Sequence, residues 1–231
     1  MAASPLFPSL PAHWKEEQVK TEGLSLRLWY NPAFPRARAL YIVHGFGEQS
    51  DRYLHFTHYL QFTVDLVAAI DLPGHGLSEG PRGHIDHFSK VTEAATRGFQ
   101  LLQKWLAEKK QNPVLHWMGH SFGGLTTLNL MRNSEMPSGP QSWIVSAPLL
   151  ELSMPVPKVK KFFGELIAPI LPRLSLANEI NPEALSKDPL VGEEYKSNSL
   201  NHSIITPRMF LEMNRAMQET REWEGPLPGS T

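Results

Sequence analysis

The stretch from Val114 to Gly124, VLHWMGHSFGG, constrains the fold more than any other part of the chain. Its apolar start predicts a short strand, and Leu125–Arg132 after it predicts a helix. Ser121 lies between them, and a sharp turn from strand to helix makes a serine project from the backbone at the cost of a strained conformation. Because Gly119 and Gly123 lack a Cβ, the strand and the helix can approach closely. The free N–H groups and positive dipole end of the helix then face the serine.

Such a turn can present Ser121 as a nucleophile. A serine hydroxyl attacks a carbonyl carbon effectively when it lies beside a base and beside N–H donors. Gly-x-Ser-x-Gly between a strand and a helix is the pattern called the nucleophile elbow. The alternative interpretation is a glycine-rich turn whose serine has no chemical role. The apolar run before the motif and the helical segment after it favour the nucleophile.

The composition argues against several classes of protein. A chain of 231 residues suffices for one large α/β domain with an insertion. Its formal net charge of −1 gives no electrostatic footprint for nucleic acid, so no such partner is expected. Without cysteine the chain has no disulfide and no thiolate metal site, and we expect neither a metal nor a cofactor.

Hydropathy predicts where the protein resides. No apolar run approaches about 18 residues, the length needed to cross a bilayer. The segment before Lys15 contains three prolines and lacks the apolar centre of a secretory signal. We therefore expect a cytoplasmic or membrane-peripheral protein.

Strand and helix patterns alternate along the first 148 residues. Besides the strand before Ser121, strands are expected in a half-exposed edge hairpin (18–20 and 24–30) and in three buried runs (39–43, 64–70 and 143–147). Amphipathic helices are expected at about 51–62, capped by Ser50, and at about 86–110, capped by Asp86. This alternation predicts an α/β fold with a mostly parallel sheet and helices on both faces.

Three strand ends carry unusual residues: His44–Glu48, Asp71–Ser78 and Gly119–Gly123. In an open parallel sheet, ligands bind outside the carboxyl ends of the strands. If the three strands are parallel, these segments meet at one rim. That convergence is the central structural prediction.

The pattern changes at about residue 149, where prolines interrupt every candidate strand. We expect residues 1–148 to form the α/β core and residues 149–206 a helical cap inserted into it. An apolar stripe over 159–171 would line an acyl-chain tunnel or simply pack on the core. Residues 207–231 are expected to return to the core as a helix, after which the chain ends early.

Four motifs in order carry a family resemblance. YIVHGFGE (41–48), Arg52-Tyr53, DLPGHGLSEG (71–80) and GHSFGG (119–124) resemble monoacylglycerol lipases and related lysophospholipases, serine hydrolases with the α/β-hydrolase fold. The resemblance covers most of residues 24–220. It implies a small lipid ester as substrate, with peripheral membrane contact through the cap.

The same resemblance implies roles for individual residues. Ser121 would be the nucleophile, and the backbone N–H groups of Phe46 and Phe122 would form the oxyanion hole. Donors of this kind stabilise the transition state by about 3 kcal/mol each. Tyr195 resembles a tyrosine that some relatives carry under the cap, where it would contact substrate or only pack.

The chain departs from the family after Ser121. The catalytic acid and histidine of this superfamily follow the serine in that order, but only Asp188 and His202 remain, both within the expected cap. We expect a capping aspartate and a surface histidine there, rather than a dyad. The last two strands of the fold, with the acid and the base, are therefore expected to be missing.

Several alternatives follow. The leading hypothesis is an esterase acting on monoacylglycerols or lysophospholipids through an acyl-enzyme on Ser121. The second is a catalytically impaired lipid-binding protein, and the third a peptidase or other esterase of the same superfamily. We expect His44 and His75 to hold loops, His120 to support the site without acting as the base, and His116 to be a satisfied core histidine.

Overall fold

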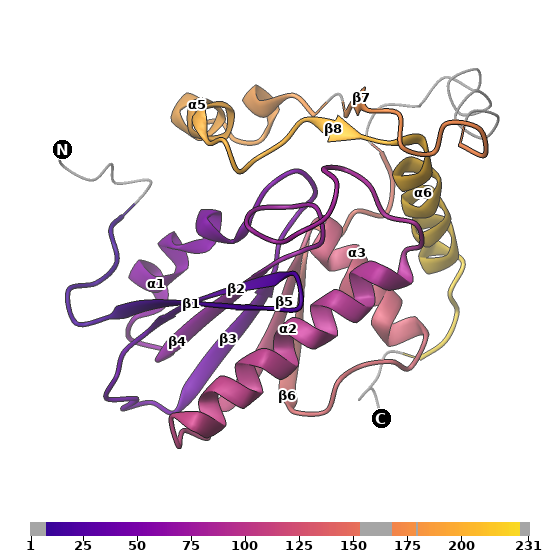
Figure 1. Ribbon diagram of the computed structural model, residues 1–231. Helices are drawn as coiled ribbons and strands as arrows, with labels where there is room; N and C mark the ends of the chain where they lie inside the picture. The colour runs from indigo at the N-terminus through magenta and orange to yellow at the C-terminus, as the bar shows by residue number, and fades with distance from the viewer. Residues whose placement is uncertain (1–7, 153–167, 179, 227–231) are drawn as a thin grey trace.

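The computed structural model describes residues 8–152, 168–178 and 180–226, and its centre is a six-stranded sheet (Figure 1). The strand order is β1-β2-β4-β3-β5-β6, in which β3, β4, β5 and β6 are parallel and the hairpin β1–β2 joins β4 antiparallel. The strands are β1 Lys15–Thr21, β2 Leu24–Tyr30, β3 Arg38–Val43, β4 Leu66–Asp71, β5 Val114–His120 and β6 Pro140–Ser146. The mostly parallel sheet is confirmed.

Successive side chains of a strand point to opposite faces of the sheet. Apolar side chains therefore lie on both faces, and each face packs against its own core. In β3, Ala39, Tyr41 and Val43 enter the larger core, which includes residues of α2 (Ser89–Glu108), α3 (Phe122–Arg132) and α6 (Pro207–Arg221). Leu40 and Ile42 enter a smaller core on the other face, against Trp14, Tyr53 and Val64. The sequence therefore shows no polar alternation in β3, as expected of a strand buried on both faces.

Three predicted elements differ in the structure. Strand β2 is not an edge strand: it is almost wholly buried and pairs with β4, so only β1 is exposed at that side. The expected helix at 51–62 is a 3-10 turn, Ser50–Tyr53, followed by the short α1, His55–Leu60, and Gln49 rather than Ser50 caps the turn. Helix α2 begins at Ser89, three residues later than expected, and the Phe88 N–H donates to Glu212 rather than to Asp86.

A separate layer follows β6. It contains the two-residue strands β7 (Leu176–Ala177) and β8 (Ile204–Ile205), the 3-10 turn η2 (Pro182–Ala184) and α5 (Pro189–Ser197). Figure 1 shows α5, β7 and β8 over the carboxyl ends of the central strands. The short strand pair was not expected, and most of the predicted apolar stripe at 159–171 lies outside the described residues. The domain boundaries at 148 and 206 stay a prediction.

Candidate active site

Ser121 lies at the tip of the turn between β5 and α3 in a conformation that few residues adopt. Its backbone angles are φ 51° and ψ −112°. A side chain at such angles is strained by about 1–3 kcal/mol, so the surroundings must hold it. Ser121 N donates to Ser146 O, and Ser121 O accepts from Leu125 N and Leu149 N, each at 3.0 Å. Neighbouring backbone thus fixes the strained turn from both sides.

The glycines around Ser121 are required by close contacts. A Cβ on Gly119 would lie 2.3 Å from Gly123 O, and one on Gly123 would lie 2.0 Å from Val43 O. Neither position has room for any side chain. The close approach of strand and helix predicted from these glycines is therefore present.

The loop Gly45–Glu48 passes beside Ser121. An ideal Cβ built on Gly45 would lie 3.3 Å from the Ser121 Cβ. The rings of Phe46 and Phe122 meet edge to face, with centroids 5.6 Å apart. Within the described residues, neither the Phe46 N–H nor the Phe122 N–H has a hydrogen-bond partner. Two unengaged amides thus belong to the two segments that meet at the serine.

Glu48 holds this loop from the inside. Its Oε1 accepts from Gly45 N at 2.6 Å and from the Tyr53 hydroxyl at 2.7 Å, while its Oε2 accepts from Arg52 Nε at 2.8 Å. Burial would raise the pKa of Glu48, but the charge of Arg52, with smaller contributions from His44, Tyr53 and the Gly45 amide, leaves that pKa lowered. Glu48 is therefore a partly buried carboxylate that organises the loop.

His44 connects the loop after β3, Gly45–Glu48, to the segment after β4, which begins at Leu72. Its Nε2 accepts from Leu72 N at 3.0 Å, so its Nδ1 carries the proton and donates to Gly45 O at 2.6 Å. His44 therefore joins the ends of β3 and β4, as predicted. The predicted convergence of the three strand ends is present in this arrangement.

Three other histidines with expected roles, His75, His116 and His120, lie in different settings. His75 is buried, with its Nδ1 3.0 Å from Pro73 O, and His116 is half-buried, with its Nδ1 2.8 Å from Ser142 Oγ. His120 lies 3.3 Å from Ser146 Oγ. None has a hydrogen bond to Ser121 Oγ within the part of the chain that the structure describes.

Asp188 and His202, the two residues that could have served as acid and base, have unrelated structural roles. Asp188 caps α5 by accepting from Leu190 N, as expected. The prediction of a surface position for His202 is wrong, because its exposed fraction is only 8%. Its ring packs on His75, 4.6 Å between centroids, and on Phe46, 5.6 Å away. Burial of this ring, together with the charge of Arg82, lowers its pKa to about 4.

Ser121 opens into a cavity of about 330 Å³. Most of its lining is apolar: Phe46, Leu149, Leu152, Ile180, Leu185, Ile205 and Met213. The polar lining residues other than Ser121 are Glu48, His120, Glu151, Asn178 and Tyr195. Tyr195, predicted to bind substrate, thus lies at the cavity, but its hydroxyl donates to Gly47 O at 2.9 Å.

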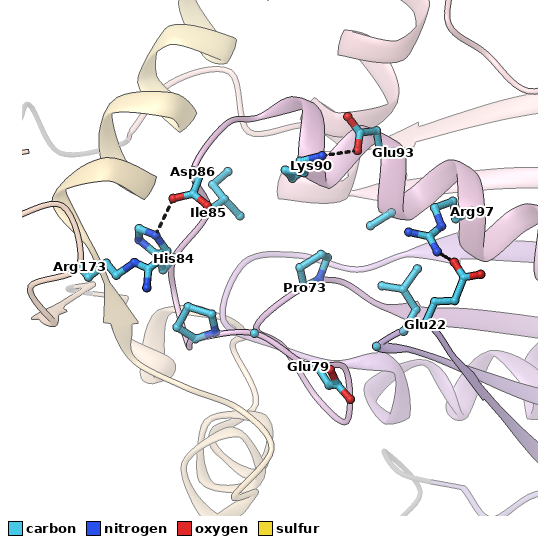
Figure 2. A pocket seen from close by; sticks show the side chains of 15 residues that line it. Glu22, Pro73, Glu79, His84, Ile85, Asp86, Lys90, Glu93, Arg97 and Arg173 are labelled. Atoms are coloured by element: carbon cyan, nitrogen blue, oxygen red, sulfur yellow. Dashed lines mark hydrogen bonds and ion pairs between the residues drawn. The ribbon is translucent and has the colours of Figure 1, made fainter.

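Another hollow is slightly larger, about 370 Å³, and lies away from Ser121 (Figure 2). Glu22 of the β1–β2 turn, Glu79 and Asp86 line it, and Lys90, Glu93 and Arg97 of α2 close one side. Glu22 also has a positive φ, 49°, but it lies in the tight turn between β1 and β2, and no serine is among the described residues that line this hollow. Volume alone would therefore select the wrong place. Among the described residues no group of side chains is arranged to hold a metal ion.

Comparison with known proteins agrees with this geometry. The family model described as serine aminopeptidase, S33 (Hydrolase_4) matches residues 35–225. The chain belongs to this family. It is an α/β-hydrolase similar to the monoglyceride lipases, as the order of its motifs predicted.

Individual relatives show how far the likeness extends. An uncharacterized abhydrolase domain-containing protein of Dictyostelium discoideum is 36% identical over 189 residues, which are 80% of this chain and 19% of that protein. Human monoglyceride lipase is 29% identical over 196 residues, 83% of this chain and 62% of the relative. A solved monoacylglycerol lipase of Paleococcus ferrophilus is 27% identical, with a TM-score of 0.64, over 90% of this chain and 72% of that one.

Sequence reasoning missed the network of Glu48, Arg52 and Tyr53. In the sequence, Glu48, Arg52 and Tyr53 stand out only as parts of the family motifs. The spacing of four residues between Glu48 and Arg52, with the acid first, was the available signal, because such pairs face each other along a helical turn.

Proposed function

We propose that the protein is a serine ester hydrolase that cleaves monoacylglycerols or lysophospholipids. One observation carries the proposal: Ser121 is held at φ 51° between β5 and α3, beside the loop of Phe46, and lines a mostly apolar cavity. Strain concentrated at one residue in a cavity favours a functional role for that residue. Family membership and the named lipase relatives support the reaction class.

The proposed reaction has two halves. Ser121 Oγ attacks the ester carbonyl carbon, its proton passes to a base, and the carbonyl oxygen becomes an oxyanion that the N–H groups of Phe46 and Phe122 stabilise. The alcohol leaves with a proton, and water then hydrolyses the acyl-enzyme. The apolar walls of the cavity suit an acyl chain.

A second function is favoured by one specific observation. Within the described residues no hydrogen bond links a histidine to Ser121 Oγ, while Asp188 caps α5 and the ring of His202 packs on His75. A serine without a base is a weak nucleophile. The alternative is therefore a protein that holds a lipid under the cap without turnover. A peptidase is the third candidate, supported only by the description of the family.

The cap also supports a proposal about location. Ile170, Leu171, Leu174 and Leu176 expose between 42% and 73% of their surface, and we propose that the cap rests on a lipid surface in the cytoplasm. No helix among the described residues is long and apolar enough to cross a bilayer. Co-sedimentation with phosphatidylcholine vesicles tests the contact, and protein that remains in the supernatant refutes it.

Covalent labelling tests the enzymatic proposal. A fluorophosphonate is expected to add to Ser121 of the folded protein, and Ser121→Ala is expected to abolish the adduct in an intact-mass measurement. A panel of monoacylglycerols, lysophosphatidylcholine and aminoacyl amides then separates esterase from peptidase. Absence of labelling, with lipid binding retained in calorimetry, would establish the non-catalytic alternative.

A further inference from the structure

The loop that carries Phe46 is in direct contact with the cap. Gly47 O accepts two hydrogen bonds at 2.9 Å, one from the Tyr195 hydroxyl of α5 and one from His202 N in the segment after it. A Cβ on Gly47 would lie 2.7 Å from His202 O and 2.8 Å from Tyr195 Oη, so the two segments touch without space between them.

Gly47 is the residue through which the loop could most easily change shape. Its φ of +77° lies in a region that glycine enters freely, so its backbone resists rotation less than that of its neighbours. The Gly47 carbonyl lies one residue beyond Phe46, so a restraint on it limits how far the loop that carries the Phe46 amide can move. In this structure that restraint comes from the cap and not from the sheet.

A second tie links the same two segments. Arg52 donates to Glu48 Oε2 at 2.8 Å and to Glu194 Oε2 at 2.7 Å, and its guanidinium lies over the Tyr195 ring, 5.1 Å from the centroid. Glu48 holds Gly45 N, the start of the loop. Glu194 and Tyr195 of the cap thus reach both ends of the loop, one through Arg52 and one directly.

We propose that the cap completes the oxyanion hole, with Tyr195 as a positioning residue whose hydroxyl holds the Gly47 carbonyl so that the Phe46 amide faces Ser121. This rests on the proposed function of Ser121. It gives Tyr195 a role different from substrate contact, because the hydroxyl that would meet a polar headgroup is already donated to the loop. Displacement of α5 would then weaken the oxyanion hole as well as open the cavity.

Tyr195→Phe tests the proposal, because it removes one hydroxyl and keeps the ring under Arg52. Two quantities are measured on the full chain: the rate constant and the half-saturation concentration for fluorophosphonate labelling of Ser121, and hydrogen exchange of the amides at 45–49. Removing one oxyanion donor outright lowers rates about 10²–10³-fold. A misplaced donor is expected to lower the labelling rate constant about 10-fold, with half-saturation changed less than twofold and exchange at 45–49 faster.

Two further variants keep the test sharp. Tyr59→Phe is the matched control, since Tyr59 is 62% exposed and lies on α1, and neither quantity should change. Glu194→Gln weakens the tie through Arg52 while keeping its shape, and a loss in labelling rate of about 2–3-fold is expected even if Tyr195→Phe folds poorly.

The outcomes separate this proposal from the proposed function. A Tyr195→Phe protein that labels at the wild-type rate overturns the positioning role, as does a change confined to half-saturation, which would indicate substrate contact. If the wild-type protein is not labelled at all, the enzymatic proposal fails. Hydrogen exchange still tests whether Tyr195 of the cap restrains the loop that carries Phe46. Faster exchange at 45–49 then supports the hold of the cap on the loop, and unchanged exchange refutes it.

Discussion

The cavity at Ser121 and the hollow of Figure 2 are similar in volume, but they differ in the interactions that maintain their walls. At the first, Ser121 is held at φ 51° by a turn whose glycines leave no space for a Cβ, and the side chain of Glu48 is only 13% exposed. The second is bounded by exposed ion pairs, including Arg97 with Glu22 and Lys90 with Glu93. A cavity built from strained, tightly packed backbone is costly to maintain, and that cost, rather than size, indicates a functional site.

The largest effect is expected from adding one methyl group at each place. In Gly123→Ala the new Cβ would lie 2.0 Å from Val43 O, whereas in Gly80→Ala, at the second hollow, it would lie 3.1 Å from Gly74 N. We expect Gly123→Ala to lower the free energy of unfolding by about 3 kcal/mol. Gly80→Ala, strained mainly by its φ of +111°, should cost about 1 kcal/mol.

Urea denaturation of both variants measures this difference. Equal midpoints for the two variants would show that the backbone at Ser121 is no more tightly packed than the backbone of the second hollow, and the comparison would fail.

The second-largest effect is expected from acid, which should destabilise the region around the Ser121 cavity. Burial lowers the pKa of His202 from 6.5 to about 4, and burial together with His44 and His202 lowers that of His75 well below its usual value. For a histidine with a lowered folded-state pKa, protonation favours the unfolded chain. Its contribution is therefore complete above pH 6.5 and is lost as the pH falls toward 4. The expected loss of unfolding free energy is about 2 kcal/mol.

His202→Phe keeps the ring against Phe46 and removes this titration. Its stability should decline less steeply between pH 6.5 and 4 than that of the wild type, as followed by thermal denaturation at a series of pH values. Parallel curves for the two proteins would contradict a role for the buried imidazole.

The smallest effect is expected at the second hollow. The side chains of Arg97 and Glu22 are 46% and 70% exposed, and exposed pairs contribute at most about 1 kcal/mol. Arg97→Ala should leave the unfolding free energy within that range and leave labelling of Ser121 unchanged. A loss above about 1.5 kcal/mol, or a change in labelling, would mean that this hollow has a function of its own.

The same contrast explains what the sequence could predict. Continuous apolar runs identified the central strands, and glycines at 119 and 123 identified the turn, because these signals arise from local packing. The interior position of β2 was missed, since its burial depends on pairing with β4, which is distant in the chain. The buried state of His202 was missed for the same reason: its neighbours Phe46 and His75 lie more than 120 residues away.

At the site, sequence reasoning identified segments better than contacts. The motifs brought Ser121, Phe46 and Phe122 into one hypothesis, and the structure brings their segments together. The hydrogen bond from Tyr195 to Gly47 spans 148 residues, and no periodicity or spacing could have predicted it. Polar contacts of this kind depend on the placement of the whole cap layer.

A crystal structure of the protein after fluorophosphonate treatment tests the central claim most directly. The account predicts phosphorus bonded to Ser121 Oγ, with the phosphoryl oxygen about 2.7–3.1 Å from both the Phe46 and the Phe122 nitrogen. An adduct on another residue, or a phosphoryl oxygen turned away from these two amides, would contradict it.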